Sequence, residues 1–353
     1  MASDADGAPE PDALAGAPHP REQVVLFGHA AAERAFLDAF SAGRLHHAWL
    51  LGGPEGIGKA TLAYRIARFL LAHRLGAPAT TLGIAKDHAV QRLISAQSHP
   101  NLAVLRRAPA TDKKVASTTI PVDAVRKATG LFGSTAADGG YRICIVDSAD
   151  DLTAPSANAL LKLIEEPPPR SIFLVVSHAP QRVLPTIRSR CHRLLLRRPS
   201  GEDIRRAVES LGAPWSGTQG SIFDEAVGLG EGSVRRTLEM LDPDKIRVVH
   251  DVSAALEALP QVDSKRVVAL AESLSRKDAD GAYALVLDTV LRWGGEQLHR
   301  RAALGAARLA PLAEACEKVA RAAQEVDEFN LDRRPLVIAL FDDLARAVRG
   351  TQA

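Results

Sequence analysis

One stretch of the sequence decides the predicted fold: Gly53-Pro54-Glu55-Gly56-Ile57-Gly58-Lys59-Ala60-Thr61. Up to its lysine it follows the phosphate-binding pattern G-x-x-x-x-G-K-[ST], whose glycines let backbone N–H groups surround phosphate oxygens. In this pattern the lysine neutralises phosphate charge and the hydroxyl residue ligates Mg²⁺. Ala60 stands at the hydroxyl position and offers no oxygen to a metal ion. Three interpretations are open: Thr61 substitutes imperfectly, the loop binds phosphate weakly, or the loop no longer supports hydrolysis.

The flanks of this loop supply the strand and the helix that a phosphate-binding loop requires. Residues 47–51 (HAWLL) form a short apolar run typical of a buried strand, and residues 24–43 before them have helical spacing. After the loop, apolar residues recur at steps of three and four over residues 61–75, which predicts a helix. The start of that helix adds a dipole that favours an anion.

Alternating strands and helices continue to Arg198, which predicts an α/β domain with a parallel sheet covered on both faces. Further strands are expected at 100–106, 142–146, 171–177 and 193–196, and helices at 121–132 and 156–166. Beyond Arg198 the pattern is almost entirely helical, with breaks expected near Pro260, Pro311 and Pro335. We therefore predict a disordered tail at 1–20, an α/β domain at 21–198, a small helical lid at 199–244 and an all-α domain at 245–353.

Composition excludes several classes of protein. The 353 residues are 46% hydrophobic and carry a net charge of +2, which argues for two or three folded domains and against a strongly basic nucleic-acid binder. Cys144, Cys191 and Cys316 show no C-x-x-C spacing, which argues against a disulfide framework and a cysteine-based zinc site. The expected location is the reducing cytoplasm, because residues 1–20 lack a signal-peptide pattern and the apolar runs are too short for a membrane span.

A second candidate site follows the apolar run 142–146 at Asp147. In nucleotide hydrolases an aspartate at this strand end supports Mg²⁺, and a following glutamate activates water. Here Ser148 follows, and a serine cannot act as a carboxylate base. Asp150 and Asp151 are expected to leave the strand, point elsewhere and cap a helix. With the metal hydroxyl also absent, we expect no efficient ATP hydrolysis by this chain alone.

Two arginines are candidates for phosphate contacts. Arg190, within Ser189-Arg190-Cys191, follows the core strand expected at 171–177 and could reach a neighbouring subunit from the domain edge. The alternative is an ordinary surface arginine. Arg235 lies in Gly232-Ser233-Val234-Arg235-Arg236, where it is placed near the nucleotide phosphates unless the glycine merely begins a helix at Ser233.

Several segments in register make the chain resemble the AAA+ clamp-loader family, and within it the delta-prime subunits of bacterial DNA polymerase III. These segments are RLHHAWLLGGPEGIGKATLA (44–63), SHPN (98–101), IPVDAVRK (120–127), SANALLKLIEEPPP (156–169) and LPTIRSRC (184–191). The resemblance covers most of the first 240 residues. The helical C-terminal region is compatible in length but carries no motif.

The resemblance implies an AAA+ module, a lid and a C-terminal collar domain in a hetero-oligomer that loads a ring-shaped sliding clamp onto primed DNA. The implied partners are the gamma/tau motor subunits, the delta subunit, the sliding clamp and primer-template DNA, without a membrane. It also implies a stator role in which Arg190 is an arginine finger acting in trans. Ser177 takes the sensor-1 place and Arg235 the sensor-2 place. The nucleotide-binding set is thus Gly53, Gly56, Gly58, Lys59, Ala60, Thr61, Asp147, Ser177 and Arg235.

The chain departs from the family pattern in its cofactor sites. Residues 73–98 hold no cysteine, whereas many clamp-loader subunits carry a four-cysteine zinc module there, so no zinc is expected. Lys59 is retained, which leaves weak or vestigial binding of ATP or ADP open, and Mg²⁺ is not expected to bind firmly. Four further arginines could contact a phosphate backbone, although a solvated helix face is the favoured interpretation: Arg197, Arg198, Arg205 and Arg206.

Two other functions compete with a clamp-loader stator. A catalytically active AAA+ motor subunit of the same complex would need a hydroxyl at Ala60 and a carboxylate at Ser148. A P-loop kinase of small molecules would place a substrate lid within one compact domain, whereas this chain adds a separate helical region of about a hundred residues.

Overall fold

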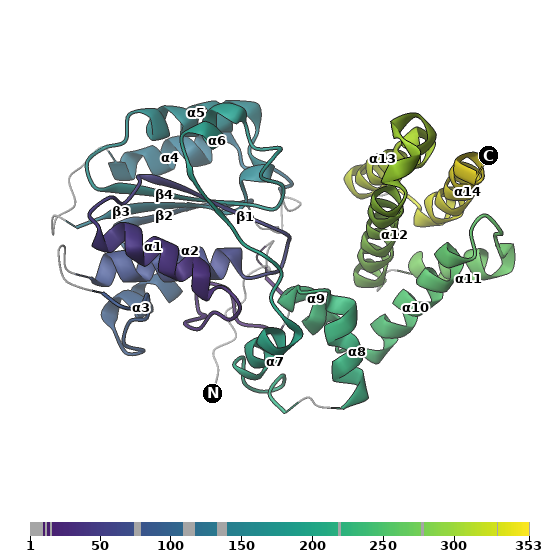
Figure 1. Cartoon of the computed structure of the whole chain (residues 1–353), viewed down its shortest axis with the longest axis horizontal. Coiled ribbons are helices and arrows are strands. Elements are labelled where there is room, and N and C mark those ends of the chain that lie inside the picture. The colour runs from purple at the N-terminus through teal and green to yellow at the C-terminus, as the bar shows by residue number, and fades with distance from the viewer. Residues whose placement is uncertain are drawn as a thin grey trace. The chain divides into compact units, whose positions relative to one another are not determined.

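The computed structural model describes residues 10, 13–14, 16–73, 79–108, 117–132, 140–217, 220–276, 279–329 and 331–352. The chain divides into two compact units, Met1–Leu238 and Glu239–Ala353 (Figure 1). The first unit contains the phosphate-binding loop and every site residue predicted from the sequence.

The first unit is built on a five-stranded parallel sheet in the order β2-β3-β4-β1-β5. Its strands are β1 (Ala48–Gly52), β2 (Leu102–Leu105), β3 (Arg142–Val146), β4 (Ser171–Ser177) and β5 (His192–Leu195). β1 lies between β4 and β5, with Leu50 opposite both Val175 and Arg193. The predicted parallel α/β architecture is confirmed, and the phosphate-binding loop leaves the sheet from an interior strand.

Helices cover both faces of this sheet, as Figure 1 shows, with α1, α2 and α3 on one face and α4, α5 and α6 on the other. Their bounds are α1 (Ala30–Ser41), α2 (Lys59–Ala72), α3 (Ala89–Ser95), α4 (Val122–Phe132), α5 (Ala154–Glu165) and α6 (Pro185–Ser189), and α7 (Gly201–Glu209), α8 (Ser221–Gly230) and α9 (Val234–Glu239) follow. The sequence analysis did not predict α3.

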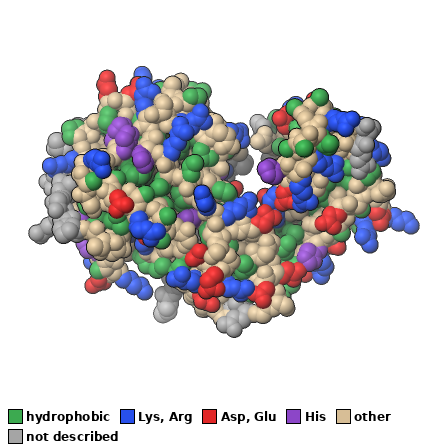
Figure 2. Space-filling view, viewed as in Figure 1, with side chains coloured by type: hydrophobic (Ala, Val, Ile, Leu, Met, Phe, Trp, Pro, Cys, Tyr) green, Lys and Arg blue, Asp and Glu red, His purple; other side chains and the backbone are tan. Residues whose placement is uncertain are grey.

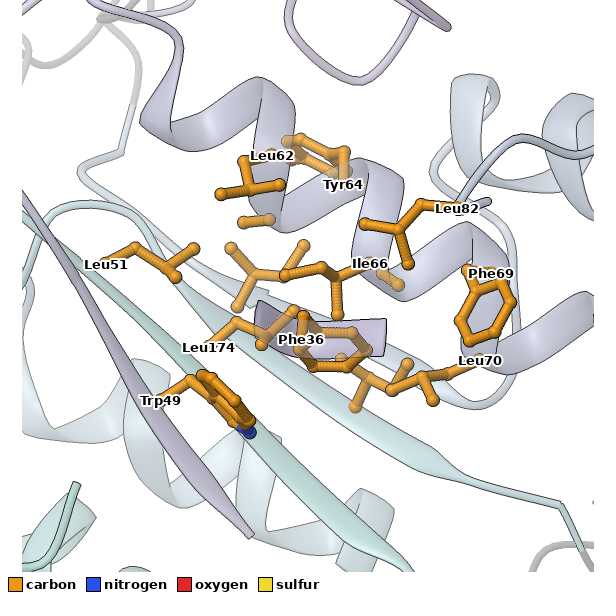
Figure 3. Close-up of a cluster of buried hydrophobic side chains, with 14 of the residues drawn as sticks. Phe36, Trp49, Leu51, Leu62, Tyr64, Ile66, Phe69, Leu70, Leu82 and Leu174 are labelled. Carbon is orange, nitrogen blue, oxygen red and sulfur yellow. The ribbon is translucent and has the colours of Figure 1, made fainter. Parts of the chain in front are cut away.

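Alternate residues of the strands point to opposite faces of the sheet and pack into two separate hydrophobic cores. Trp49, Leu51 and Leu174 pack with α1 and α2 on one face, where Figure 3 shows Phe36, Ile66 and Phe69 among them. Leu50 and Phe173, one residue away along their strands, pack with α4 and α5 on the other. Because β1, β3 and β4 are buried on both faces, their sequences are continuous apolar runs and not alternating ones.

The first helix begins later than predicted, at Ala30 instead of Val24. The backbone of residues 21–24 is held by side chains of α2. Arg68 donates from Nη1 to the Gln23 carbonyl at 2.7 Å, and Arg65 donates to the Val24 carbonyl. These carbonyl oxygens are bound by arginines far along the chain, and the segment forms no helix in spite of its helical spacing.

The described part of the N-terminal segment is ordered, unlike the predicted tail at 1–20. Glu10 lies 3.0 Å from His19 Nε2 and 2.5 Å from Arg21 Nη1, and it also pairs with Arg106. Trp215 Nε1 donates to the Gly16 carbonyl at 3.1 Å. Residues 1–9, 11–12 and 15 of the predicted tail lie outside the described residues.

The second unit is helical and encloses its own apolar core, which includes Val290, Leu312 and Leu344. Its helices are α10 (Pro243–Glu257), α11 (Ser264–Leu274), α12 (Asp280–Arg300), α13 (Ala306–Phe329) and α14 (Arg333–Gln352), with a short 3₁₀ turn at Ala302–Leu304.

Helix breaks were predicted at three prolines of this unit. Two of these prolines lie at helix boundaries, and the third does not. Pro260 separates α10 from α11, and Pro335 lies in the first turn of α14, where its missing N–H costs nothing. The break predicted at Pro311 is wrong, because Pro311 lies inside α13. The neighbouring Leu312 and Ala315 are buried, and this packing holds the helix together despite one lost hydrogen bond.

The surface carries mixed charge. On the face shown in Figure 2, basic and acidic side chains are interspersed over both units. Over the residues that the structure describes, every helix is too short or too polar to cross a bilayer.

Candidate functional site

The phosphate-binding loop connects β1 to α2 and depends on glycine at two points. A Cβ on Gly53 would lie 2.6 Å from the Leu196 carbonyl oxygen, too close for any side chain. Gly56 has φ +74°, and a Cβ there would lie 2.0 Å from Ser233 Oγ. The loop is therefore packed on both sides, against the end of β5 and against the start of α9.

A cavity of about 210 Å³ lies over this loop. Its polar lining includes Glu55, Lys59, Thr61, Asp147, His178 and Arg235. Its apolar lining includes Leu14, Pro18, Leu26, Phe27, Leu211 and Leu238. A lining that combines cationic and apolar side chains suits a nucleotide, which joins anionic phosphates to a base.

The structure brings most of the predicted nucleotide-binding residues to this cavity: Gly56, Gly58, Lys59, Ala60, Thr61, Asp147 and Arg235 line it. Gly53 does not line it and instead packs at the base of the loop. Ser177 ends β4 beside the cavity, whose wall is formed by its neighbours Val176 and His178. Arg190 is not among the residues that line the cavity.

Lys59 is turned into its own loop. Its side chain is buried, with 3% exposure, and Nζ donates to the Pro54 carbonyl oxygen. Burial lowers the pKa of Lys59 to about 8, although Glu55, Asp150 and Asp147 oppose this shift. A phosphate group in this loop would share the ammonium group with the Pro54 carbonyl or replace that carbonyl, because the ammonium group carries three N–H donors.

The start of α9 closes over the loop. The Val234 N–H donates to the Gly56 carbonyl at 3.0 Å, and Ser233 Oγ accepts from the Arg236 N–H at 3.2 Å. Ser233 is thus the residue that begins the helix and also the residue that contacts Gly56. This arrangement brings Arg235 to the cavity wall.

His29 braces the loop from the other side and was missed by the sequence analysis. It is 4% exposed, and its Nε2 lies 2.6 Å from the Ile57 carbonyl oxygen, so the ring donates from Nε2. Burial lowers the pKa of His29, which favours the neutral ring. No local pattern distinguishes this histidine, because its partner lies in a different segment of the chain.

Asp150 is held at the sheet edge, contrary to the expectation that it points elsewhere. Its carboxylate accepts from Ser148 Oγ at 2.7 Å and from Ser177 Oγ at 3.0 Å. It also accepts from the backbone N–H groups of His178 at 2.6 Å and Ala179 at 3.1 Å. The expectation was wrong because a 3₁₀ turn at Ala149–Asp151 brings the side chain back toward β4.

These contacts determine the chemistry of Asp150. Burial alone would raise its pKa, but the hydrogen bonds from His178, Ser148, Ser177 and Ala179 outweigh burial and lower the pKa. Asp150 is thus an ionised acceptor occupied by four donors. The Ser177 hydroxyl proton, which the sensor-1 assignment would direct at a phosphate, is directed at Asp150.

The cap that the sequence analysis assigned to the aspartates is made by Ser148, whose side chain accepts from the Asp150 N–H. Asp151 instead pairs with Arg107, with 3.3 Å between Oδ2 and Nε. Asp147 is buried at the end of β3 and lines the cavity. The end of β3 therefore keeps the carboxylate of Asp147, while the next residue, Ser148, caps a 3₁₀ turn.

Arg190 forms a second candidate site at the end of α6. Ile187 and Cys191 are buried and fix the backbone on either side of it, whereas its own side chain is 42% exposed. The guanidinium donates from Nη1 to the Thr186 carbonyl at 3.1 Å, and Nη2 lies 3.0 Å from Glu165 Oε1. The arginine is thus presented at the surface and oriented by contacts within its own chain.

The other basic residues considered for nucleic-acid contact are mostly paired within the unit. Arg198 lies 3.2 Å from Glu231, Arg205 pairs with Asp224, and Arg206 lies 3.8 Å from Asp203. Arg197 is exposed.

Within the described ranges, no group of three or more His, Cys, Asp or Glu side chains is arranged to hold a metal ion. Cys144 and Cys191 are buried free thiols, and burial raises the pKa of both to about 12. The expectations about zinc and Mg²⁺ remain predictions.

Comparison with known proteins gives concordant matches. The family model described as "DNA polymerase III, delta subunit" matches residues 28–200. A DNA polymerase III subunit delta' of Yersinia pestis is 31% identical over 74% of this chain and 74% of its own length. The corresponding protein of Pseudomonas aeruginosa is 41% identical over 41% of each chain.

Two further matches are to gamma-type subunits. A DNA polymerase III subunit gamma/tau of Mycobacterium tuberculosis is 34% identical over 58% of this chain and 34% of its own length. The chain therefore matches less than half of the Pseudomonas and Mycobacterium relatives. A gamma subunit-related protein of Thermotoga maritima, known as a crystal structure, aligns with 89% of this chain and 98% of its own at 16% identity and a TM-score of 0.41.

Proposed function

Because this chain belongs to the family of DNA polymerase III delta-prime subunits, we propose that it acts in DNA replication as the stator of a clamp loader. In this role it helps to place a sliding clamp on primed DNA, and it completes the ATP site of a neighbouring subunit with Arg190. Its partners in the proposal are the gamma/tau and delta subunits, the clamp and, through the complex, primer-template DNA.

One observation carries the proposal: the phosphate-handling groups of this chain are divided between two places. The loop side chain that would neutralise phosphate, Lys59, is bound to Pro54 in its own loop. The arginine that could stabilise phosphoryl charge, Arg190, lies at the surface and away from the lining of the cavity. An exposed, oriented guanidinium suits a phosphate that belongs to another subunit.

The cavity over the loop supports weak nucleotide binding as part of the proposal. Its lining includes Lys59 and Arg235, which can receive phosphate, and apolar side chains that can receive a base. Ala60 supplies no hydroxyl for Mg²⁺, and Ser177 is occupied by Asp150. We therefore propose that ATP or ADP binds weakly, that Mg²⁺ adds little, and that zinc has no role.

The alternative is a catalytically active motor subunit. The similarity to a gamma/tau subunit is the observation in its favour. It would require a metal ligand near Ala60 and a carboxylate that activates water. Thr61 lines the cavity, but successive residues of a helix point about 100° apart, so it does not present its hydroxyl where residue 60 would. Position 148 holds a serine, and the carboxylate oxygens of Asp150, two residues further on, are occupied by four donors.

The test is ATP turnover by the purified chain alone, with and without Mg²⁺. We expect turnover indistinguishable from that of a Lys59→Ala variant, because neither chain assembles a metal-activated water. Mg²⁺-dependent hydrolysis that co-purifies with the chain and disappears in Lys59→Ala would overturn the stator assignment in favour of the motor.

A further inference from the structure

Arg190 is held by three groups of its own chain. Nη1 donates to the Thr186 carbonyl and lies 3.5 Å from Ser189 Oγ, both within α6. Nη2 meets the carboxylate of Glu165, the last residue of α5. Of these partners only Glu165 carries charge, so it is the one that competes electrostatically with an incoming phosphate.

Packing fixes the two helix ends that carry Glu165 and Arg190. Ile164 beside it is buried in the core under β3 and β4, and Ile187 of α6 is buried in the same core. α5 ends at Glu165, ahead of Pro167-Pro168-Pro169, which cannot continue a helix. Two rigid helix ends thus bring one carboxylate to the arginine.

We infer that Glu165 holds Arg190 on its own subunit and releases it when a neighbour's nucleotide offers a stronger anionic partner. This inference rests on the proposed role of Arg190 in trans. A guanidinium that reaches a phosphoryl group while still paired with Glu165 would bring a carboxylate beside the phosphate, and the two anions repel each other. The pair therefore has to open before the arginine acts at full charge.

The exposure of the pair suits such an exchange. The side chains of Arg190 and Glu165 are 42% and 38% exposed, so water screens their attraction. An exposed ion pair of this kind shifts an equilibrium by no more than about fivefold. Contacts with a phosphoryl group in a transition state are worth far more, on the order of 10³-fold in rate. Glu165 therefore restrains the arginine without preventing its use.

The chain offers a matched control in the next residue. Glu166 is also an exposed glutamate at the end of α5, but the contact to Arg190 is made by Glu165. Glu165→Gln and Glu166→Gln remove the same charge from adjacent positions, so they differ in the ion pair and in little else.

The experiment measures ATP turnover by the reconstituted clamp loader, with Mg²⁺ and without DNA, using five variants of this subunit. We expect Glu165→Gln to raise turnover about two- to fivefold and Glu166→Gln to leave it unchanged. Arg190→Ala should lower turnover, and Glu165→Gln/Arg190→Ala should equal Arg190→Ala, because Glu165 acts only through the arginine. Glu165→Ala should change turnover in the same direction as Glu165→Gln, and size-exclusion chromatography checks that each complex is intact.

The outcomes separate the two proposals. A loss of turnover in Arg190→Ala together with unchanged or lowered turnover in Glu165→Gln would overturn the restraint and leave the trans role standing. Unchanged turnover in Arg190→Ala would remove the trans role and the restraint together. An effect of Glu165→Gln that persists in the Arg190→Ala background would show that Glu165 acts by another route.

Discussion

The phosphate-binding loop and the end of α6 use positive charge in opposite ways. Lys59 is buried, has a lowered pKa and points its ammonium group at a carbonyl of its own loop. Arg190 is exposed and keeps part of its guanidinium facing solvent. The first group is arranged for the stability of the loop, and the second is arranged to be reached from outside.

The comparison shows why the retained lysine alone does not identify a working ATPase. A loop can keep its glycines because Leu196 and Ser233 leave no room for a Cβ, whatever binds there. Arg190 has no comparable steric constraint, because its side chain is 42% exposed and its partners are a carbonyl and an exposed carboxylate. The function of the loop and the function of the arginine can therefore be tested separately.

The largest expected effect comes from Arg190→Ala. In the reconstituted clamp loader we expect DNA-stimulated ATP turnover to fall on the order of 10³-fold, because a trans arginine stabilises the charge of the transferring phosphoryl group. Arg193→Ala removes an equally exposed arginine nearby and should leave turnover within about twofold. Equal turnover in the wild-type and Arg190→Ala complexes would place Arg190 outside the catalytic reaction.

A smaller effect is expected at the loop. We expect ADP affinity, measured by calorimetry on the isolated chain, to fall about tenfold between pH 7 and pH 9. The reason is that the Lys59 pKa is about 8, and phosphate binds the protonated ammonium form, which is lost as the pH rises. Lys59→Met should bind ADP about 10- to 100-fold more weakly and without this pH dependence. The same pH profile in wild type and Lys59→Met would exclude the lysine from the phosphate site.

The smallest effect is expected for Asp150→Asn, which tests whether Asp150 is structural. The amide group would place N–H donors against donors that now meet a carboxylate, so we expect a loss of about 1–2 kcal/mol in the free energy of unfolding. Urea denaturation at pH 7 measures this loss, and Asp123→Asn, at an exposed helix position, is the control.

The difference in the free energy of unfolding between wild type and Asp150→Asn should depend on pH, and the lowered pKa of Asp150 determines the direction. The pKa of Asp150 is lowered from 3.8 by folding, so its contribution to stability is present above that value and is lost as the pH falls through the lowered pKa. The gap between wild type and Asp150→Asn should therefore narrow in acid. A gap that stays constant would show that the charge of Asp150 does not stabilise the fold.

Local pattern predicted the central sheet well. The runs Arg142–Val146 and Ser171–Ser177 were predicted at their observed bounds, because strands buried on both faces are continuously apolar. Prediction failed where a residue far along the chain determines the backbone conformation of a segment. The start of α1 depends on Arg65 and Arg68, whose side chains bind carbonyls some forty residues earlier.

For the candidate site, the sequence alone determined the kind of loop, the missing hydroxyl at Ala60, the serine at position 148 and the presence of Arg190. These are properties of residue type and spacing, and folding does not change them. Only the tertiary structure decided that Lys59 turns to Pro54, that Asp150 returns to Ser177, and that Glu165 holds Arg190. Each of these three contacts depends on how a loop turns or on which strand and helix ends lie together. The spacing of side chains along the sequence does not determine which ends lie together.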